Sequence, residues 1–445
     1  MSRHQSSTLV KNGSGARYSI PLSTLDATLG AVSTGRTFFF HEPLDGASMR
    51  ESLARVLATY PLLSGRVERE ADGRLRVICN DRGVPFEEVS LPIRARDFME
   101  ATQGGVNADH SALPKSSVTR VTGKKIPTLS VKLTHFSCGG SALGVRMKHV
   151  LADGQSYMQF MLDWAAEHRG VPYSIPCHDR QLLDGLGYAI SPQELQYSER
   201  FGVPSKLARY ALLSRMVLHA NKIQTVTLRF EEDEIRNMKR AAGRILEQAD
   251  WISSADALTA HLWRALSELR GQNGSPFERL SSLVNFKRSI TEVPPNYWGN
   301  TVTSVKTWMG SREIGTRHLG EVALLVRRAV STGIEEDVRR DIAYLLRQRS
   351  EGNGKRVMPN ISIQEDSNLT QFNNRSRIPY YDLSFNRDFP FRLEMPKLPI
   401  PWSVQIMPTP EKDGSREVHL SLPSATAENL ASESAWMVNL HRYAS

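Results

Sequence analysis

The sequence predicts an α/β fold with two domains, and three observations lead to this prediction. First, the chain has 445 residues, which exceeds the size at which a single hydrophobic core normally stops growing. Second, strand-like and helix-like patterns are interspersed in both halves of the chain. Third, residues 170–215 are rich in Pro, Gly and polar side chains and show little periodicity. We therefore expect one domain over residues 1–175, a crossover over 176–215 and a second domain over 216–445.

The first half combines strand patterns with helical ones. Strand patterns occur in RTFFFHE (36–42), LLSGRVER (62–69), ADGRLRVICNDRGVPFEEV (71–89), LSVKLTHFS (129–137) and SALGVRMKH (141–149). Asp72-Gly73 marks one turn between strands, and Cys138-Gly139-Gly140 marks another. The second turn lacks the glycine spacing of a phosphate-binding loop, so we expect a simple hairpin there. Apolar residues at helical spacing predict helices over 46–61 and 155–169.

The second half shows a similar mixture. Strand patterns occur in IQTVTLRF (223–230), LSSLVNF (280–286), PWSVQIMP (401–408) and EVHLSLP (417–423). Helical patterns occur over 231–246, 253–270 and 311–350 and in a short segment at the end of the sequence. Ser253 or Ser254 opens the helix over 253–270, with Asp256 in its first turn. The glycine-rich SEGNGKR (350–356) is a loop without the remainder of a P-loop.

Composition and charge are those of a globular protein. The sequence is 40% hydrophobic and 23% charged. Its formal net charge of +9 fits either an ordinary basic surface or a positive entrance for an anionic partner. The Lys and Arg residues are scattered and form no basic stripe interleaved with aromatics, so we expect no nucleic-acid partner. No run approaches the ~18 consecutive apolar residues of a membrane helix, so we expect no membrane insertion.

The cysteine pattern indicates neither a metal site nor a disulfide framework. Cys79, Cys138 and Cys177 are far apart and form no CxxC pair. Free thiols suit a reducing compartment. The N-terminal residues are polar and lack the apolar centre of a secretory signal. We therefore expect a cytosolic protein without a bound metal.

The strongest chemical signal is HVLADG (149–154), at the junction of a predicted strand and a predicted helix. A neutral imidazole at a strand end can accept a proton from a hydroxyl or amine that attacks a carbonyl. We expect Asp153 to brace the turn and orient the imidazole of His149. Gly154 supplies either unusual backbone angles or close packing at the helix start. Taken alone, so short a pattern is also compatible with a structural histidine.

Six segments, in the same order along the chain, resemble the BAHD acyltransferase family. They are LSTLDATLG (22–30), YPLLSGRVE (60–68), DGRLRVICNDRGVPF (72–86), HFSCGGSALGVRMKHVLADGQSYMQFMLDWA (135–165), SSADALTAHLWRA (253–265) and VNFKRSITEVPPNYWGN (284–300). The fourth contains the equivalent of the family's HxxxDG, and the sixth resembles its VNxRxR…YxGN run. The resemblance covers nearly the whole chain and makes His149 the candidate catalytic base.

This resemblance implies two similar-sized chloramphenicol-acetyltransferase-like domains, with mixed β-sheets flanked by helices and a channel between them. A segment around residues 370–400 would pack with the first domain. The resemblance also implies a monomer that uses acyl-CoA as co-substrate, a small alcohol or amine of specialised metabolism as acceptor, and no permanently bound cofactor. His149 would deprotonate the acceptor, which attacks the thioester and gives a tetrahedral oxyanion without an acyl-enzyme.

The same resemblance suggests the remaining site residues. Thr370 lies in the segment that resembles T-S-W and is the candidate donor to the oxyanion. The family's DFGWG motif is degenerate here, because Ser384 replaces its Asp and Arg387 its Trp, while Phe385 is kept. In the family that Asp pairs with an Arg of the VNxRxR run, so both partners of the pair have changed. The candidates on the CoA side are Lys287, Arg288, Phe385 and Arg387, the last of which could meet a CoA phosphate.

Two alternatives remain open. The degenerate DFGWG is compatible with a BAHD-fold protein that has lost thioester chemistry and acts as a binding or regulatory module. The intact HVLADG favours an enzyme over such a module. The second alternative keeps acyl transfer but takes the acyl group from the phosphopantetheine of a carrier protein. It predicts a docking surface for that carrier protein.

Overall fold

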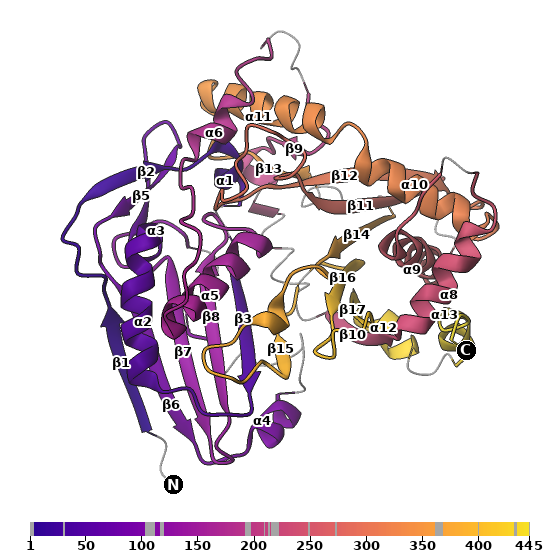
Figure 1. The fold of residues 1–445 in the computed structure, drawn as a ribbon. Helices are drawn as coiled ribbons and strands as arrows, with labels where there is room; N and C mark the ends of the chain where they lie inside the picture. The colour runs from indigo at the N-terminus through magenta and orange to yellow at the C-terminus, as the bar shows by residue number, and fades with distance from the viewer. Residues whose placement is uncertain are drawn as a thin grey trace.

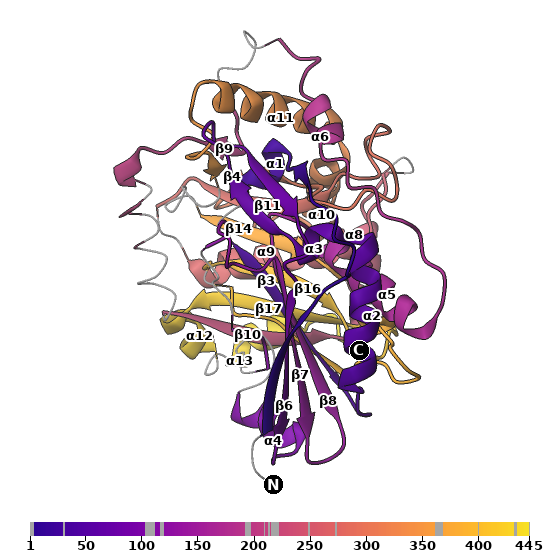
Figure 2. The same ribbon diagram turned by 90° about the vertical axis from the view of Figure 1, so that its left-hand side faces the viewer.

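The computed structural model describes residues 4–444 except 30–31, 103–111, 116–119, 192–196, 209, 212–213, 215–221, 248–249, 272–273, 361–367, 399 and 431–433. The described part is a mixed α/β structure with two six-stranded sheets, one mainly from each half of the chain (Figures 1 and 2). The predicted boundary between the crossover and the second domain, at residues 215 and 216, lies outside the described residues.

The first sheet has the strand order β1-β6-β7-β8-β3-β15. Its strands are β1 (His4–Val10), β6 (Val84–Leu91), β7 (Leu129–Phe136), β8 (Ser141–Lys148), β3 (Ser33–Phe40) and β15 (Arg392–Glu394). A three-stranded sheet beside it contains β2 (Tyr18–Pro21), β5 (Leu75–Cys79) and β4 (Arg66–Arg69). Helices α2 (Gly46–Thr59) and α5 (Gly154–Arg169) pack together on one face of the first sheet, and α4 (Ala95–Ala101) packs on the other (Figure 1).

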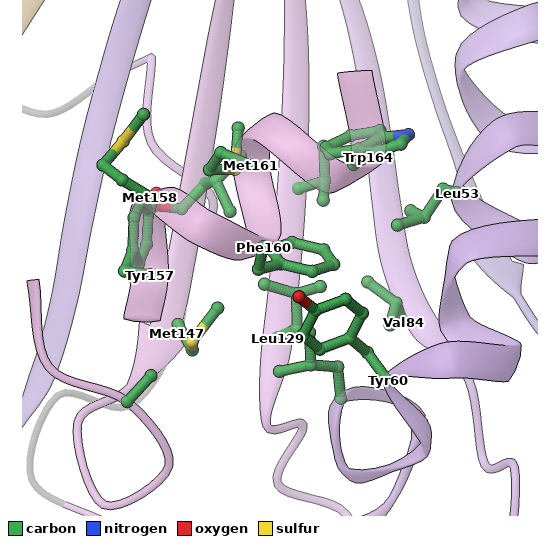
Figure 3. Packing of buried hydrophobic residues seen from close by; sticks show 14 of the residues in the cluster. Leu53, Tyr60, Val84, Leu129, Met147, Tyr157, Met158, Phe160, Met161 and Trp164 are labelled. Atoms are coloured by element: carbon green, nitrogen blue, oxygen red, sulfur yellow. The ribbon is translucent and has the colours of Figure 1, made fainter. Parts of the chain in front are cut away.

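The core under α5 fixes the position of that helix (Figure 3). Phe160 and Trp164 project from α5 and are completely buried, and the ring centre of Tyr60 lies 5.2 Å from that of Phe160. Burying a side chain of this size stabilises the fold by ~1.5–3 kcal/mol relative to leaving it exposed. The helix predicted over 155–169 and its apolar face are therefore confirmed. Because α5 is held along its length, its first residue, Gly154, has a fixed place at the end of β8.

The second sheet has the order β10-β17-β16-β14-β11-β12. Its strands are β10 (Ile223–Phe230), β17 (Arg416–Pro423), β16 (Ser403–Pro408), β14 (Leu369–Asn374), β11 (Phe277–Asn285) and β12 (Val302–Gly310). The helices that share its core are α8 (Glu232–Gly243), α9 (Ser254–Arg270), α10 (Leu319–Ser331), α12 (Ser424–Leu430) and α13 (Ser434–Leu440). In both sheets parallel and antiparallel pairs occur together, which confirms the predicted mixed sheets.

The two halves share elements. A separate apolar cluster joins α1 (Thr24–Thr28), α6 (Gln181–Gly185) and α11 (Ile334–Ser350). Late in the chain, the 3-10 turn η4 (Tyr380–Asp382) and Phe385 contribute to the core of the first half. β15 then pairs antiparallel with β3, with Leu393 opposite Phe38. Short strands β9 (Phe201–Gly202) and β13 (Met358–Pro359) also pair with each other.

Two predicted elements need correction. The helical pattern over 311–350 corresponds to two helices, α10 and α11, and starts only at Leu319; Gly333 between the helices has a φ of 71°, a left-handed conformation that glycine adopts without strain. The strand expected over 62–69 begins only at Arg66, in β4. Pro61 starts a single helical turn, α3 (Pro61–Ser64), and proline is favoured at the first position of a helix. No helix in the described ranges is long and apolar enough to cross a membrane.

Candidate active site

His149 lies in the tight turn that connects β8 to α5. The strand ends at Lys148, and Leu151 N donates to the Lys148 carbonyl at 3.0 Å. His149 N donates to the carbonyl of Val32, just before β3, at 3.0 Å. The histidine backbone is therefore attached to the end of its own strand and to the start of a neighbouring one.

Two side chains from distant segments hold the carbonyl groups of this turn. Asn300 Nδ2 donates to His149 O at 2.9 Å and to Asp26 Oδ1 at 2.7 Å. Arg180 Nη2 donates to Leu151 O at 2.8 Å, and its Nη1 lies 3.3 Å from both oxygens of Asp26. Asp26 and Arg180 are almost fully buried. The LSTLD and YWGN segments were part of the family resemblance. The sequence did not predict that Asp26 and Asn300, which lie in them, bind each other next to the His149 turn.

Asp153 caps α5 and attaches it to the second half of the chain. Its Oδ1 accepts from Ser156 N at 2.9 Å, which is the usual role of an N-cap side chain. Its Oδ2 accepts from Thr301 N at 2.9 Å, from Thr301 Oγ1 at 3.0 Å and from Asn285 Nδ2 at 3.3 Å. Both oxygens are thus occupied by groups other than the imidazole of His149, and the carboxylate braces the turn through Thr301 and Asn285.

Gly154 leaves room for two neighbouring side chains. A Cβ at this position would lie 3.2 Å from Ile378 Cδ1 and 3.5 Å from Arg36 Nη2. Gly154 is not among the glycines with positive φ. Of the two roles that its sequence position suggested, close packing at the helix start is the one that the structure supports.

The imidazole of His149 is partly exposed, although protein surrounds most of it. Burial lowers the pKa of His149 below its ordinary 6.5, and its own carbonyl and Asp153 only partly oppose this effect. The positive charges of Arg375 and Arg36 lower the pKa further. Its Nδ1 has no hydrogen-bond partner among the other described residues. A lowered pKa keeps the ring neutral at pH 7, which is the state that a general base requires.

Arg36 and Arg375 are the functional candidates that sequence reasoning missed. Arg36 lies in β3, where its guanidinium carbon is 3.9 Å from the ring centre of Tyr157. Arg375 directly follows β14, and its backbone N donates to Ile406 O at 2.8 Å. For Arg36 the available signal was an arginine at the start of the strand pattern RTFFF, since a charged residue is unusual in a buried strand.

Thr370 lies in β14 and is bound to an arginine of α9. Thr370 Oγ1 accepts from Arg270 Nη2 at 2.9 Å, and Arg270 Nη1 pairs with Glu278 at 2.5 Å. Glu278 also lines a cavity of about 490 Å³ in the second half. Thr370 precedes Arg375 by five residues of extended chain, which spans about 16 Å at 3.3 Å per residue. The geometry therefore gives no support to the oxyanion role predicted for Thr370.

Lys287 is half-buried and close enough to Asp153 for that carboxylate to affect its pKa. Burial lowers the pKa of Lys287, and the nearby Asp153 carboxylate partly offsets this. Lys287 N donates to Asn285 Oδ1 at 3.0 Å, at the end of β11. Arg288 is exposed. Lys287 is linked to Asp153 through Asn285, which binds the Lys287 backbone and the Asp153 carboxylate.

Phe385 and Arg387 are separated from that pair. Phe385 is buried, and its ring centre lies 5.1 Å from that of Trp164. Trp164 is ten residues into α5, which corresponds to ~15 Å from the helix start. Arg387 is exposed, and Ser384 Oγ donates to the Asn386 carbonyl at 2.8 Å. The four predicted residues therefore do not form one cluster, and Ser384 is engaged within its own turn.

Other histidines have structural partners. The contacts run from His135 Nε2 to Glu88 at 2.9 Å, from His178 Nε2 to Thr59 O at 2.8 Å and from His261 Nε2 to Leu440 O at 2.7 Å. In the part of the chain that the structure describes, no three His, Cys, Asp or Glu side chains are grouped so that they could hold a metal ion.

Comparison with known proteins relates this site to a family of enzymes. The family model described as "Transferase family" matches residues 5–437. Agmatine hydroxycinnamoyltransferase 1 of Oryza sativa subsp. japonica is 26% identical over 440 residues, covering 91% of this chain and 90% of that protein. Shikimate O-hydroxycinnamoyltransferase of Nicotiana tabacum is 25% identical over 403 residues, covering 87% and 86%.

Solved structures share the fold. TRI101 of F. graminearum, complexed with coenzyme A and deoxynivalenol, has a TM-score of 0.76 at 18% identity and covers 94% of this chain and 98% of its own. Vinorine synthase has a TM-score of 0.67 at 18% identity, with 96% of each chain covered. At this level of identity the likeness concerns the arrangement of the backbone.

Proposed function

Because the chain belongs to the Transferase family, the BAHD acyltransferases, we propose that it transfers an acyl group from acyl-CoA to a hydroxyl or amine of a small metabolite. Relatives are named for both kinds of transfer: one is a shikimate O-hydroxycinnamoyltransferase, and another, of Avena sativa, is a 5-hydroxyanthranilate N-hydroxycinnamoyltransferase. One observation carries the proposal: the backbone of His149 is held by hydrogen bonds to Val32 and Asn300, and the side chain is only partly exposed. Burial lowers the pKa of His149, which favours the neutral imidazole.

His149 acts as the general base of the transfer. It accepts the proton of the acceptor hydroxyl or amine while that oxygen or nitrogen attacks the thioester carbonyl. The tetrahedral intermediate collapses, its C–S bond breaks, and the CoA thiolate leaves and takes the proton that His149 accepted, which returns the imidazole to its neutral form. Both substrates are bound together, and no bond forms between the acyl group and the protein. A positioned base of this kind contributes roughly 10²–10⁴-fold to the rate.

Asp153 and Gly154 serve as positioning residues. Asp153 is bound to Thr301 and Ser156, so it fixes the distance between the histidine turn and the second half. Gly154 allows Arg36 and Ile378 to approach the helix start. Four residues remain our candidates for contacts with CoA: Lys287, Arg288, Phe385 and Arg387. Phe385 and Arg387 lie apart from Lys287 and Arg288.

The protein would act as a monomer in the cytosol, without nucleic acid. Light scattering tests the oligomeric state, and we expect a single species with the mass of one chain. A stable dimer would require a revision of that part of the proposal.

The proposed function is tested by the acceptor-dependent release of CoA thiol. Acetyl-, malonyl-, benzoyl- and hydroxycinnamoyl-CoA should each be combined with pooled acceptors that include agmatine and shikimate. We expect at least one donor to release thiol only when an acceptor is present. Saturable CoA binding without release from any donor would favour a binding module. If no acyl-CoA binds at all, the proposal fails and a carrier-protein donor becomes the next hypothesis.

A further inference from the structure

A cavity in the second half of the chain is lined by arginines from three separate elements. Its volume is about 490 Å³, which is within the size of sites that hold small organic molecules. Its walls come mainly from α9, from the turn after β12, and from α13 with the residues that follow it (Figure 1). Arg264 projects from α9, Arg312 from the turn and Arg442 from the segment after α13. Three cations thus surround one hollow.

These three arginines have only neutral partners in the described part of the chain. Arg264 Nη2 donates to Gly315 O at 2.8 Å, and Arg442 Nη1 donates to Asn439 Oδ1 at 3.2 Å. No ion pair between described residues includes Arg264, Arg312 or Arg442. Burial lowers the pKa of Arg264, and the charge of Arg442 lowers it further. The two guanidinium groups are therefore close enough to repel each other.

The acidic side chains of the cavity leave an excess of positive charge. Glu278 is buried, and Arg270 Nη1 pairs with it at 2.5 Å, so its charge is already neutralised. Glu268 is the other carboxylate among the described lining residues, and its Oε2 accepts from Asn439 Nδ2 at 3.4 Å. One available carboxylate thus faces three arginines. A cleft lined by charges of one sign attracts ligands of the opposite sign.

The remainder of the wall offers apolar and neutral groups. Trp436, Ile314 and Leu440 are buried and line the cavity. Trp436 Nε1 donates to Ala265 O at 3.2 Å, which holds the indole in place. His261 Nε2 donates to Leu440 O at 2.7 Å, and burial lowers the pKa of His261 to about 4, so it adds no charge at pH 7. An inorganic ion would fill only a small part of this space, so the ligand has an organic part as well.

The cavity is separate from the histidine turn. Glu278 lines it near the start of β11, whereas Asn285 at the end of β11 binds the Asp153 carboxylate. Asn285 follows Glu278 by seven residues of extended strand, which span about 23 Å at 3.3 Å per residue. A ligand in the cavity therefore does not occupy the place of a substrate at His149.

We propose that this cavity is a second binding site, for a small organic anion whose carboxylate or phosphoryl group pairs with Arg264, Arg312 and Arg442 and whose apolar part lies against Trp436. A planar guanidinium offers two parallel N–H groups that match two oxygens of either anion. The site is additional to acyl transfer and does not depend on it, because binding can be measured without turnover.

Three probes with the same ring system test the site: 1-naphthyl phosphate, 1-naphthoate and the neutral 1-naphthalenemethanol. Their dissociation constants are measured by calorimetry with the full chain. We expect at least one of the two anions to bind at least ~10-fold more tightly than the alcohol, since charge-assisted pairs are among the stronger hydrogen bonds. Tighter binding of the phosphate assigns a phosphoryl ligand, and tighter binding of the naphthoate assigns a carboxylate. Equal dissociation constants for all three probes overturn the inference.

Variants then assign the preference to the cavity. Arg264→Gln and Arg442→Gln should each remove most of the advantage of the anion over the alcohol. The control is Arg317→Gln, because Arg317 lies in the same turn as Arg312, is exposed and pairs with Glu321 at 3.2 Å, but does not line the cavity. Arg442 is exposed, so its variant keeps the test usable if Arg264→Gln fails to fold, which melting temperature reports.

Two further outcomes would overturn the inference. The first is an anion preference that survives both cavity variants or that Arg317→Gln also removes, because the probes would then bind elsewhere or respond only to net charge. The second is loss of the preference in folded His149→Ala, which would place the anion at the proposed active site. A preference that His149→Ala retains supports the second site even if no acyl transfer is detected in the wild type.

Discussion

His149 takes its reactivity from residues that are distant in sequence. Asn300, 151 positions later, binds its carbonyl, and burial together with Arg375 and Arg36 lowers its pKa. The sequence identified His149 and Asp153 because a strand, a turn and a capped helix are local features. It could not identify Asn300 or Arg375 as neighbours, since their approach depends on how the two sheets meet.

The lowered pKa of His149 has a consequence for the pH dependence of the enzyme. The base must be neutral to act, and a pKa below 6.5 keeps it neutral as the pH falls through that value. We expect the acidic decline of kcat/KM to be centred below pH 6.5. In Arg375→Gln, which lacks one of the charges that lower this pKa, the decline should move to higher pH. A wild-type decline centred above pH 6.5 would contradict this expectation.

At the scale of elements, the start of α5 and the turn before β12 act as one unit. Asp153 caps α5 and binds Thr301, while Ser156 Oγ in the first turn of the helix donates to the Gly299 carbonyl at 2.8 Å. Trp298 Nε1 donates to Ser156 O at 2.6 Å. The histidine turn is thus held between a helix of the first half and a turn of the second.

Asn300→Ala tests this unit. The change removes the hydrogen bonds to His149 O and to Asp26 and leaves these acceptors only longer contacts, from Ala152 N and Arg180 Nη1 at 3.3 Å, at a cost of about 1–3 kcal/mol in the free energy of unfolding. A displaced histidine should lower kcat by roughly 10- to 100-fold. The control is Asn296→Ala in the same turn, an exposed residue that donates to Ile175 O at 2.9 Å. We expect kcat in the control to stay near wild type; equal losses in both variants would argue against a role for Asn300 at the histidine.

Elements could be predicted where their signal is periodic and local. The apolar faces of α5 and α9 repeat at helical spacing, and Ser253 caps α9 with Asp256 as predicted. The break at Gly333 was missed because one glycine does not interrupt a helical pattern in the sequence. Thr370 lies in β14, where its hydroxyl accepts from Arg270, a contact that the sequence could not indicate.

At the scale of the whole molecule, the two halves are interlocked. Residues 380–394 pack into the first core and add β15 to the edge of the first sheet, although they come after most of the second sheet. The three residues of β15 pair with residues 353 to 357 positions earlier and carry no periodic signal. The mixed α/β class and the family were accessible from the sequence, because six motifs over residues 22–300 follow the family's order; the family model matches residues 5–437.

The most direct test of His149 as the general base compares His149→Ala with His135→Ala. His135 lies in β7 of the same sheet and contacts Glu88, so its removal controls for the loss of a histidine. Both variants should be assayed with the donor and acceptor pair that supports thiol release, after their melting temperatures have been compared with that of the wild type. We predict a fall in kcat/KM of at least ~100-fold for His149→Ala, the scale of a lost base, and near wild-type activity for His135→Ala. A folded His149→Ala protein that keeps more than about a tenth of the wild-type kcat/KM would contradict the assignment of His149 as the base.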